Sequence, residues 1–185
     1  MIRSIALNSK GAGGWSGLDS DDLRQLLCSK NYGKTAESFC DAVADLTKRL
    51  CRVFVDPESL TSFLACRLIP LEKGENDVRP IGIGETLRRI VGKAAVRAIR
   101  EDIQAACGSL QVCAGLEAGC EAAVHAVRAS FESDETEAAL LIDASNAFNS
   151  VRRECTFRNI ATLCPSFYIF LVNTYRRPIR LLIPA

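Results

Sequence analysis

The stretch LLIDASNAFN, residues Leu140–Asn149, carries the strongest fold signal in the sequence. A short apolar run ends there in one acid, and an aromatic residue follows five positions later. A run of this kind, entered from the acidic segment 132–137, predicts a buried strand. Asp143 then stands at the end of the strand, where a carboxylate can hold a metal ion at the rim of a sheet. A strand followed by an Asp-capped helical turn is the simpler alternative.

The composition is typical of a soluble globular protein. Of the 185 residues, 48% are hydrophobic and 24% are charged, and the net charge is +1. Such a balance excludes a globally basic nucleic-acid-binding protein, so any basic surface must be local. No apolar run approaches the ~20 residues of a membrane span. Residues Met1–Ser4 also lack the apolar core of a secretion signal. We therefore expect an intracellular protein of the cytoplasm or nucleus, without a membrane partner.

Nine cysteines are many for a chain of this length. Their number is odd and no two are spaced as Cys-x-x-Cys, so we expect reduced thiols that are mostly buried. Cys113, Cys120 and His125 match no zinc-finger spacing. His125 lies within a predicted helix without a carboxylate partner, which favours a packed or half-exposed histidine over a catalytic one.

The pattern along the chain predicts helices and one hairpin. Residues 1–18 are glycine-rich without a Gly-Lys-Ser/Thr motif, so we expect an irregular lead and not a phosphate loop. Two strand-like segments around a polar turn predict a β-hairpin over about 66–83. Apolar residues at helical spacing, with Pro57 and Pro165 at two helix starts, predict helices over 19–28, 35–51, 57–64, 86–105, 121–131, 152–163 and 165–175. Residues 180–183 are a possible strand.

The helix predicted over 86–105 has a divided surface. One side is apolar, and the other carries basic residues at steps of four, four and three. These residues form a stripe, Arg89, Lys93, Arg97 and Arg100. The stripe is either an ordinary solvated face or a surface that contacts nucleic-acid phosphates.

Five segments follow one another in an informative order. They read LIPLEK (68–73), DVRPI (77–81), QVCAG (111–115), EAAVHA (121–126) and IDASNAF (142–148). The series resembles the fingers and first palm motif of a reverse transcriptase, most closely the RNA-directed DNA polymerase domain of animal retroelements, whose palm motif reads Asp-x-x-Asn-Ala-Phe-Asn. The resemblance covers residues 16–185.

This resemblance implies an α+β fold, in which fingers and a partial palm combine many helices with a small mixed sheet. The chain would divide into an irregular lead (1–18), a fingers-like region (19–135) and a partial palm (136–185). Its chemistry would be nucleotidyl transfer to a primer 3′-hydroxyl. The partners of the complete enzyme would be an RNA template, a DNA primer and a deoxynucleoside triphosphate, and its cofactor Mg²⁺.

The palm motif implies specific roles for its residues. Asp143 would hold Mg²⁺, together with the backbone carbonyl of Ala144. The amides of Asn146 and Ala147 would lie near the triphosphate. Phe148 would lie under the sugar and leave no room for a 2′-hydroxyl, although it is also suited simply to anchor the turn to the core.

The fingers segments carry further implied contacts. Lys73 and Arg79 would close over the triphosphate, where Arg offers a fork of donors and Lys a point charge. Two solvated charges on a surface turn are the alternative for this pair. Gln111 and Gly115 match a segment that approaches the templating strand. The basic stripe, with Arg89, Lys93 and Arg97, would contact template phosphates without reading sequence.

The sequence also departs from the family. A later Tyr-x-Asp-Asp hairpin, a Gln-Gly segment and a thumb are not present, and no Asp or Glu follows Glu154. One carboxylate cannot hold the two Mg²⁺ ions that polymerisation uses. We therefore expect this chain to be inactive alone. A non-catalytic nucleic-acid-binding or adaptor module derived from such a polymerase is the alternative. The sequence does not indicate an oligomeric state.

Overall fold

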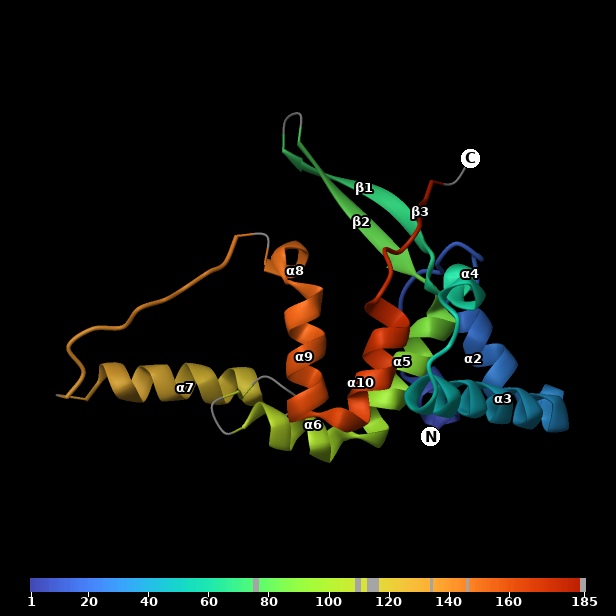
Figure 1. The fold of residues 1–185 in the computed structure, drawn as a ribbon, viewed down its shortest axis with the longest axis horizontal. Coiled ribbons are helices and arrows are strands. Elements are labelled where there is room, and N and C mark those ends of the chain that lie inside the picture. Colours follow the sequence, from blue (N-terminus) through green and yellow to red (C-terminus); the bar gives the residue numbers. More distant parts are fainter. Residues whose placement is uncertain (75–76, 109–110, 113–116, 134, 146, 184–185) are drawn as a thin grey trace.

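The structure, a computed structural model, describes residues 1–74, 77–108, 111–112, 117–133, 135–145 and 147–183. It has the expected α+β character, with many helices and a small mixed sheet of three strands. Figure 1 shows a long hairpin rising from a helical body, while a separate helix reaches away from it. Within the described ranges, no helix combines the length and the apolar character that crossing a membrane requires.

Helix α5 lies at the centre of the helical body. Its Ile90, Val91, Ala94 and Ala95 are fully buried. The core around them includes side chains from the helices that surround α5. The body consists of α1 (Ile2–Leu7), α2 (Ser20–Cys28), η1 (Lys30–Tyr32), α3 (Gly33–Arg52), η2 (Pro57–Leu60), α4 (Thr61–Leu64), α5 (Thr86–Ala98) and α10 (Pro165–Tyr175). The remaining helices are α6 (Arg100–Cys107), α7 (Gly119–Phe131), α8 (Ala147–Ser150) and α9 (Arg153–Leu163).

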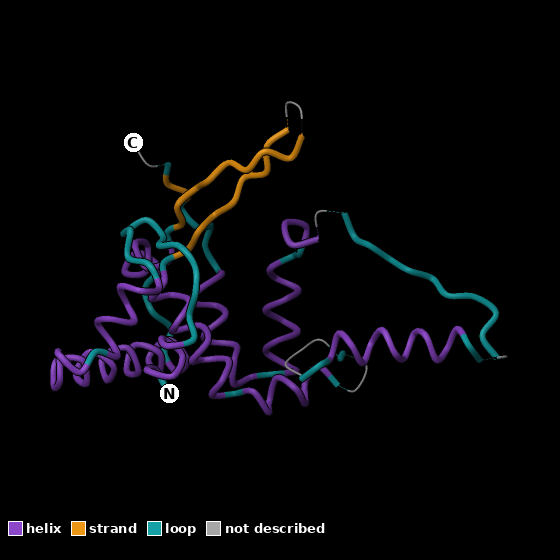
Figure 2. The backbone as a smooth tube through the Cα atoms, turned by 180° about the vertical axis from the view of Figure 1, so that it is seen from behind, coloured by secondary structure: helices purple, strands orange, loops and turns teal. Residues whose placement is uncertain are grey.

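The sheet confirms the predicted hairpin. Strands β1 (Cys66–Gly74) and β2 (Asp77–Gly84) pair antiparallel, with Leu71 opposite Arg79. Strand β3 (Leu181–Leu182) pairs in parallel with the first two residues of β1, so the strand order is β2-β1-β3 (Figure 2). The far half of the hairpin therefore stands clear of the helical body.

The expectation of a wholly irregular lead over 1–18 is wrong for its first residues. Ile2, Ile5 and Ala6 repeat at helical spacing and are buried, and they hold α1 in the core. The remainder of the lead is not helical, but polar contacts tie it to the body. Glycine-rich composition concealed both features, because it predicts flexibility in the absence of partners.

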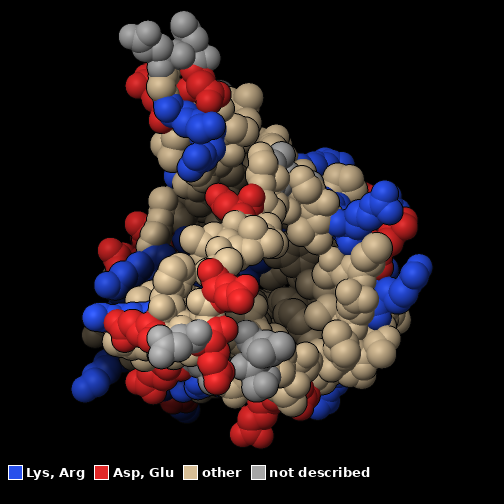
Figure 3. Space-filling view, turned by 90° about the vertical axis from the view of Figure 1, so that its left-hand side faces the viewer, with Lys and Arg blue, Asp and Glu red and all other residues tan. Residues whose placement is uncertain are grey.

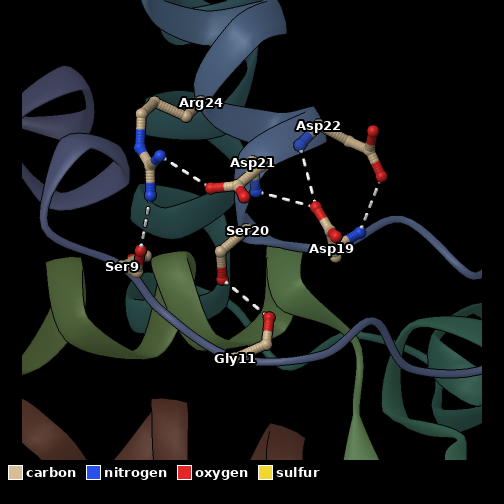
Figure 4. A network of polar contacts seen from close by, with 7 residues as sticks. All are labelled: Ser9, Gly11, Asp19, Ser20, Asp21, Asp22 and Arg24. Atoms are coloured by element: carbon tan, nitrogen blue, oxygen red, sulfur yellow. Dashed lines mark hydrogen bonds and ion pairs between the residues drawn. The ribbon is translucent and has the colours of Figure 1, made fainter.

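Helix α2 fixes the first part of the lead (Figure 4). Arg24 donates from Nη2 to the carbonyl of Ser9 (3.1 Å) and pairs through Nη1 with Asp21 (2.6 Å). Ser20 Oγ donates to the carbonyl of Gly11 (3.1 Å). Asp19 caps the helix, and the backbone N–H groups of Asp22 and Asp21 lower the pKa of its carboxyl.

The start of α5 fixes the rest of the lead. Ser16 donates to the Glu85 carboxylate from its backbone N (2.8 Å) and its Oγ (2.6 Å). Arg89 donates from Nη2 to the carbonyl of Ala12 (2.6 Å). Gly14 packs so closely that a Cβ there would lie 2.7 Å from the backbone N of Glu85. Glycine at this position is needed for close approach.

Replacing Gly14 by alanine should destabilise the fold, because the added methyl group meets backbone atoms that cannot rotate away. We expect Gly14→Ala to lower the free energy of unfolding by about 1–3 kcal/mol in urea denaturation. Gly92→Ala is the matched control, since a Cβ there meets nothing within 4 Å and α5 should gain about 0.5–1 kcal/mol. Equal effects of the two changes would contradict the close approach.

Three other expectations need correction. The helix predicted over 86–105 ends at Ala98, because Ile99 leaves helical geometry (φ −121°). This break lets α6 turn toward α10. There Asp102 accepts a hydrogen bond from Ser166 Oγ (2.6 Å). His125 is exposed on α7 and is not packed. The described cysteines are all free, but Cys107, Cys120 and Cys155 are exposed, so the expected burial holds only in part.

The buried strand expected at 140–142 is not formed. These residues are an irregular segment whose side chains are highly exposed, 84% at Leu140 and 86% at Leu141. An apolar run becomes a strand only where a neighbour accepts its backbone hydrogen bonds. Among the described residues, β1 pairs with β2 and with β3, and no strand pairs with this segment.

Helix α10 is tied to the distant end of α3 by Asn173, which is 2% exposed. Its Nδ2 donates to the carbonyls of Leu50 (2.9 Å) and Val53 (2.8 Å). Its Oδ1 accepts from the backbone N of Val55 (2.9 Å). One side chain therefore satisfies three backbone groups where α3 ends.

Asn173→Leu should leave those backbone groups without their partner. Since each buried unsatisfied group costs about 1–3 kcal/mol, we expect the free energy of unfolding to fall by about 3 kcal/mol. Asn8→Ala is the control, because that exposed amide only donates to Ser4 within α1 (2.8 Å). Thermal and urea denaturation measure both changes. A loss at Asn173 no larger than at Asn8 would contradict the role of Asn173 in joining α10 to the end of α3.

Candidate functional site

Residues from the hairpin and from the segment after Asp143 line one cavity of about 720 Å³. We call it the hairpin pocket, and its lining is Lys73, Asp77, Val78, Arg79, Pro80, Ile81, Asp143, Ala144, Ser145 and Ala147. Five of these are residues that the sequence analysis assigned to metal or nucleotide: Lys73, Arg79, Asp143, Ala144 and Ala147. Basic and acidic side chains lie next to each other near the hairpin tip (Figure 3).

The hairpin places its two basic side chains by different means. The register moves from Glu72 opposite Val78 to Gly74 opposite Asp77, so Lys73 is the extra residue of a bulge. A bulge re-aims the side chain it carries. The Lys73 ammonium lies 3.4 Å from the Asp77 carboxylate, with both side chains more than half exposed. Arg79 has no hydrogen-bond or ion-pair partner among the described residues.

The carboxylates of the hairpin pocket can hold at most a simple metal site. Asp143 is exposed, and the other acid in the lining is Asp77. Among the described residues, no three His, Cys, Asp or Glu side chains are grouped for metal binding. Mg²⁺ is often held by one or two carboxylates together with substrate phosphates. Two acids in the lining match that number of carboxylates. They do not provide the ligands of a two-ion centre.

Some predicted site residues cannot be placed. Asn146 and Gly115 lie outside the described residues, and so does the side chain of Phe148. The contact of Phe148 with a sugar therefore stays a prediction. Gln111 is described and exposed, and it lies in neither of the two cavities that hold the other predicted residues.

A second cavity, of about 1170 Å³, contains the basic stripe. We call it the basic cavity. Helix α5 supplies one wall, α10 another, and Cys66, Gly82 and Gly84 at the base of the hairpin a third. Its charged lining residues are Arg88, Arg89, Lys93, Arg97, Arg100 and Glu117. The excess of positive charge makes this the local basic surface that the near-neutral composition allowed.

The cations of the basic cavity have different tasks. Arg89 already has partners, because its Nη2 donates to the carbonyl of Ala12 in the lead and, at 2.6 Å, to Thr86 Oγ1. Among the described residues, the Arg97 guanidinium contacts Ser4 Oγ alone, at 3.4 Å. Lys93 is exposed and has no hydrogen-bond or ion-pair partner among the described residues. Of these three predicted template contacts, Lys93 is thus the most available to an anion.

Sequence reasoning did not identify three residues of these cavities, namely Asp77, Arg88 and Tyr175. Asp77 was part of the resembling segment, but its pairing with Lys73 depends on the bulge. Arg88 precedes the stripe, and its place beside the Tyr175 ring (5.8 Å from the centroid) depends on how α10 packs. The only sequence signal for Arg88 was its proximity to four other basic residues on one helix.

No protein-family model, curated protein or solved structure matches this chain.

Releasing Lys73 from Asp77 should strengthen anion binding at the hairpin pocket. We expect Asp77→Asn to tighten the binding of inorganic tripolyphosphate about two- to fivefold, because an exposed ion pair contributes up to about 1 kcal/mol. Asp45→Asn is the matched control, since Asp45 holds Lys48 in the same way (2.9 Å) on α3, away from the pocket. Isothermal titration calorimetry in the absence of divalent cations would measure both affinities. An identical response of the two variants would remove the pocket from consideration.

Proposed function

We propose that this chain is the fingers and the first part of the palm of an RNA-directed DNA polymerase, and that the hairpin pocket binds the triphosphate of a deoxynucleoside triphosphate. One observation carries the proposal. Lys73 and Arg79 are far from Asp143 in the sequence, yet all three line the same cavity. The resemblance independently implies a shared ligand for these residues.

The chemistry of the lining supports a triphosphate. The Arg79 guanidinium can bind phosphate oxygens as a fork, and Lys73 can follow the ligand as a mobile charge. Asp143 and Asp77 add negative charge, which repels a bare triphosphate but suits one that carries Mg²⁺. The proposed ligand is therefore the magnesium complex of the nucleotide.

The proposed catalytic contribution is incomplete. In-line transfer of a nucleotidyl group uses two metal ions to stabilise the attacking and leaving oxygens. Asp143 would contribute one carboxylate to that arrangement. The remaining carboxylates would come from the Tyr-x-Asp-Asp motif, which this sequence does not contain.

Nucleotide binding is the direct test. We expect the chain to bind a Mg²⁺-loaded deoxynucleoside triphosphate, and Arg79→Ala to weaken that binding about tenfold, because a hydrogen bond to a charged group contributes about 1.5–3 kcal/mol. Arg52→Ala, at the exposed end of α3, removes an equal charge and should leave the affinity unchanged. Fluorescence competition with a labelled nucleotide would measure the affinities. An Arg79 variant that binds as well as the unaltered chain would overturn the proposed pocket.

Primer extension tests the expected inactivity. With an RNA template, a DNA primer, deoxynucleotides and Mg²⁺, we expect no incorporation by this chain alone, because the two-ion site is incomplete. The measurement is denaturing gel electrophoresis of a labelled primer. Incorporation that disappears in Asp143→Ala would show that this chain is a competent polymerase and would contradict the prediction.

A second candidate function is a nucleic-acid-binding module without catalysis. The basic cavity favours it, because its cations are independent of Asp143. Under this function, Lys93→Glu would weaken binding of a primer–template strongly and in a salt-dependent way, while Asp143→Ala would not change it. The polymerase function adds the requirement for nucleotide binding at the hairpin pocket.

A further inference from the structure

We propose that the basic cavity binds a single strand of nucleic acid, with an unpaired base stacked on Tyr175 and the adjacent phosphates on Lys93 and Arg97. The inference rests on the proposed nucleic-acid role. It goes further by naming an unpaired strand as the ligand and an aromatic residue as the contact for the base.

The walls of the basic cavity differ in chemistry. Helix α5 presents cations, while α10 presents Phe170, Thr174 and Tyr175. The two helices stand next to each other below the hairpin (Figure 1) and also contact each other in the core. A ligand in this cavity therefore meets positive charge on one side and aromatic surface on the other.

Tyr175 provides an accessible aromatic side chain for stacking. It is 44% exposed at the edge of the core, and it is the more accessible of the two aromatic residues in the cavity, since Phe170 is 6% exposed. The guanidinium of Arg88 lies over its ring at 5.8 Å. Arg88 is itself held by the carbonyl of Leu64 (3.2 Å), so the ring has a fixed cationic neighbour. Arg88 occupies one face of the ring, so the proposed base would stack on the opposite face, which the 44% exposure of the residue allows.

The phosphate contacts come from the α5 wall. Lys93 and Arg97 are one helical turn apart, and both are exposed. Among the described residues, Lys93 has no hydrogen-bond or ion-pair partner. The Arg97 guanidinium makes one contact there, a long hydrogen bond to Ser4 Oγ. Gly92 lies beside Lys93, and a Cβ at Gly92 would meet nothing within 4 Å, so the wall has open space at this point.

Cations that follow a backbone, combined with an aromatic ring for a base, are typical of single-strand recognition. A duplex offers the same phosphates, but its bases are already stacked on one another. Tyr175 would gain no base from a duplex without breaking that stack. The arrangement therefore favours an unpaired strand, and its selectivity depends on Tyr175 more than on charge.

The test compares strands that differ only in their bases. Fluorescence anisotropy with the full chain would measure binding of a labelled single-stranded oligoadenylate, of an abasic strand with the same sugar–phosphate backbone, and of a duplex of equal length. We expect the oligoadenylate to bind about tenfold more tightly than the abasic strand. Tyr175→Phe should keep that difference and Tyr175→Leu should abolish it, with abasic binding unchanged. Tyr32→Leu, at an exposed tyrosine outside the cavity, is the matched control.

Lys93→Glu should weaken binding of both strands and make their salt dependence less steep. Equal affinity of the unaltered chain for adenylate and abasic strands would overturn the stacking proposal, whether or not Tyr175→Leu folds. Tighter binding of the duplex would overturn it as well. If the unaltered chain binds the nucleotide but no strand, the strand-binding proposal is wrong and the proposed nucleotide pocket is not affected. Strand binding without nucleotide binding would defeat only the hairpin pocket.

Discussion

The bonds of the buried Asn173 amide to the end of α3 determine where α10 lies. They join residues more than a hundred positions apart, and they do so where α3 has ended and its backbone needs partners. Arg176 strengthens the same junction by donating to the carbonyl of Val55. Once α10 is fixed, Tyr175 lies beside Arg88 and the chain continues into β3, which pairs with the base of β1. The aromatic wall of the basic cavity thus depends on a polar contact made outside that cavity.

The hairpin connects the two candidate sites. Its base contributes Gly82 and Gly84 to the basic cavity, and its far half contributes Lys73 and Arg79 to the hairpin pocket. Because β1 and β2 remain paired between these ends, the hairpin is one continuous element that spans both. A polynucleotide in the basic cavity and a nucleotide in the hairpin pocket would contact the same two strands.

Local sequence signals predicted the elements that have a strong local pattern. The periodicity of 35–51, the proline at the start of α10 and the two strand-like segments of the hairpin all correspond to observed elements. Expectations were wrong where distant contacts decide the outcome. Ile99 ends α5 without any glycine or proline, and 140–142 has strand-like residues but no paired strand among those described. The hairpin pocket joins residues selected by resemblance, whereas Arg88 and Tyr175 meet only through tertiary packing, which periodicity does not reveal.

The exposed apolar segment 138–142 has a consequence for the behaviour of the protein in solution. Its leucines and isoleucine are more than four-fifths exposed, which is the composition and accessibility of a self-associating strand. The residues before it, 132–137, include four carboxylates. Such acids act as gatekeepers, because like charges on neighbouring molecules keep the apolar segments apart. Colloidal stability is therefore set by a few carboxylates next to the Asp143 segment, and it decreases as high salt screens their repulsion.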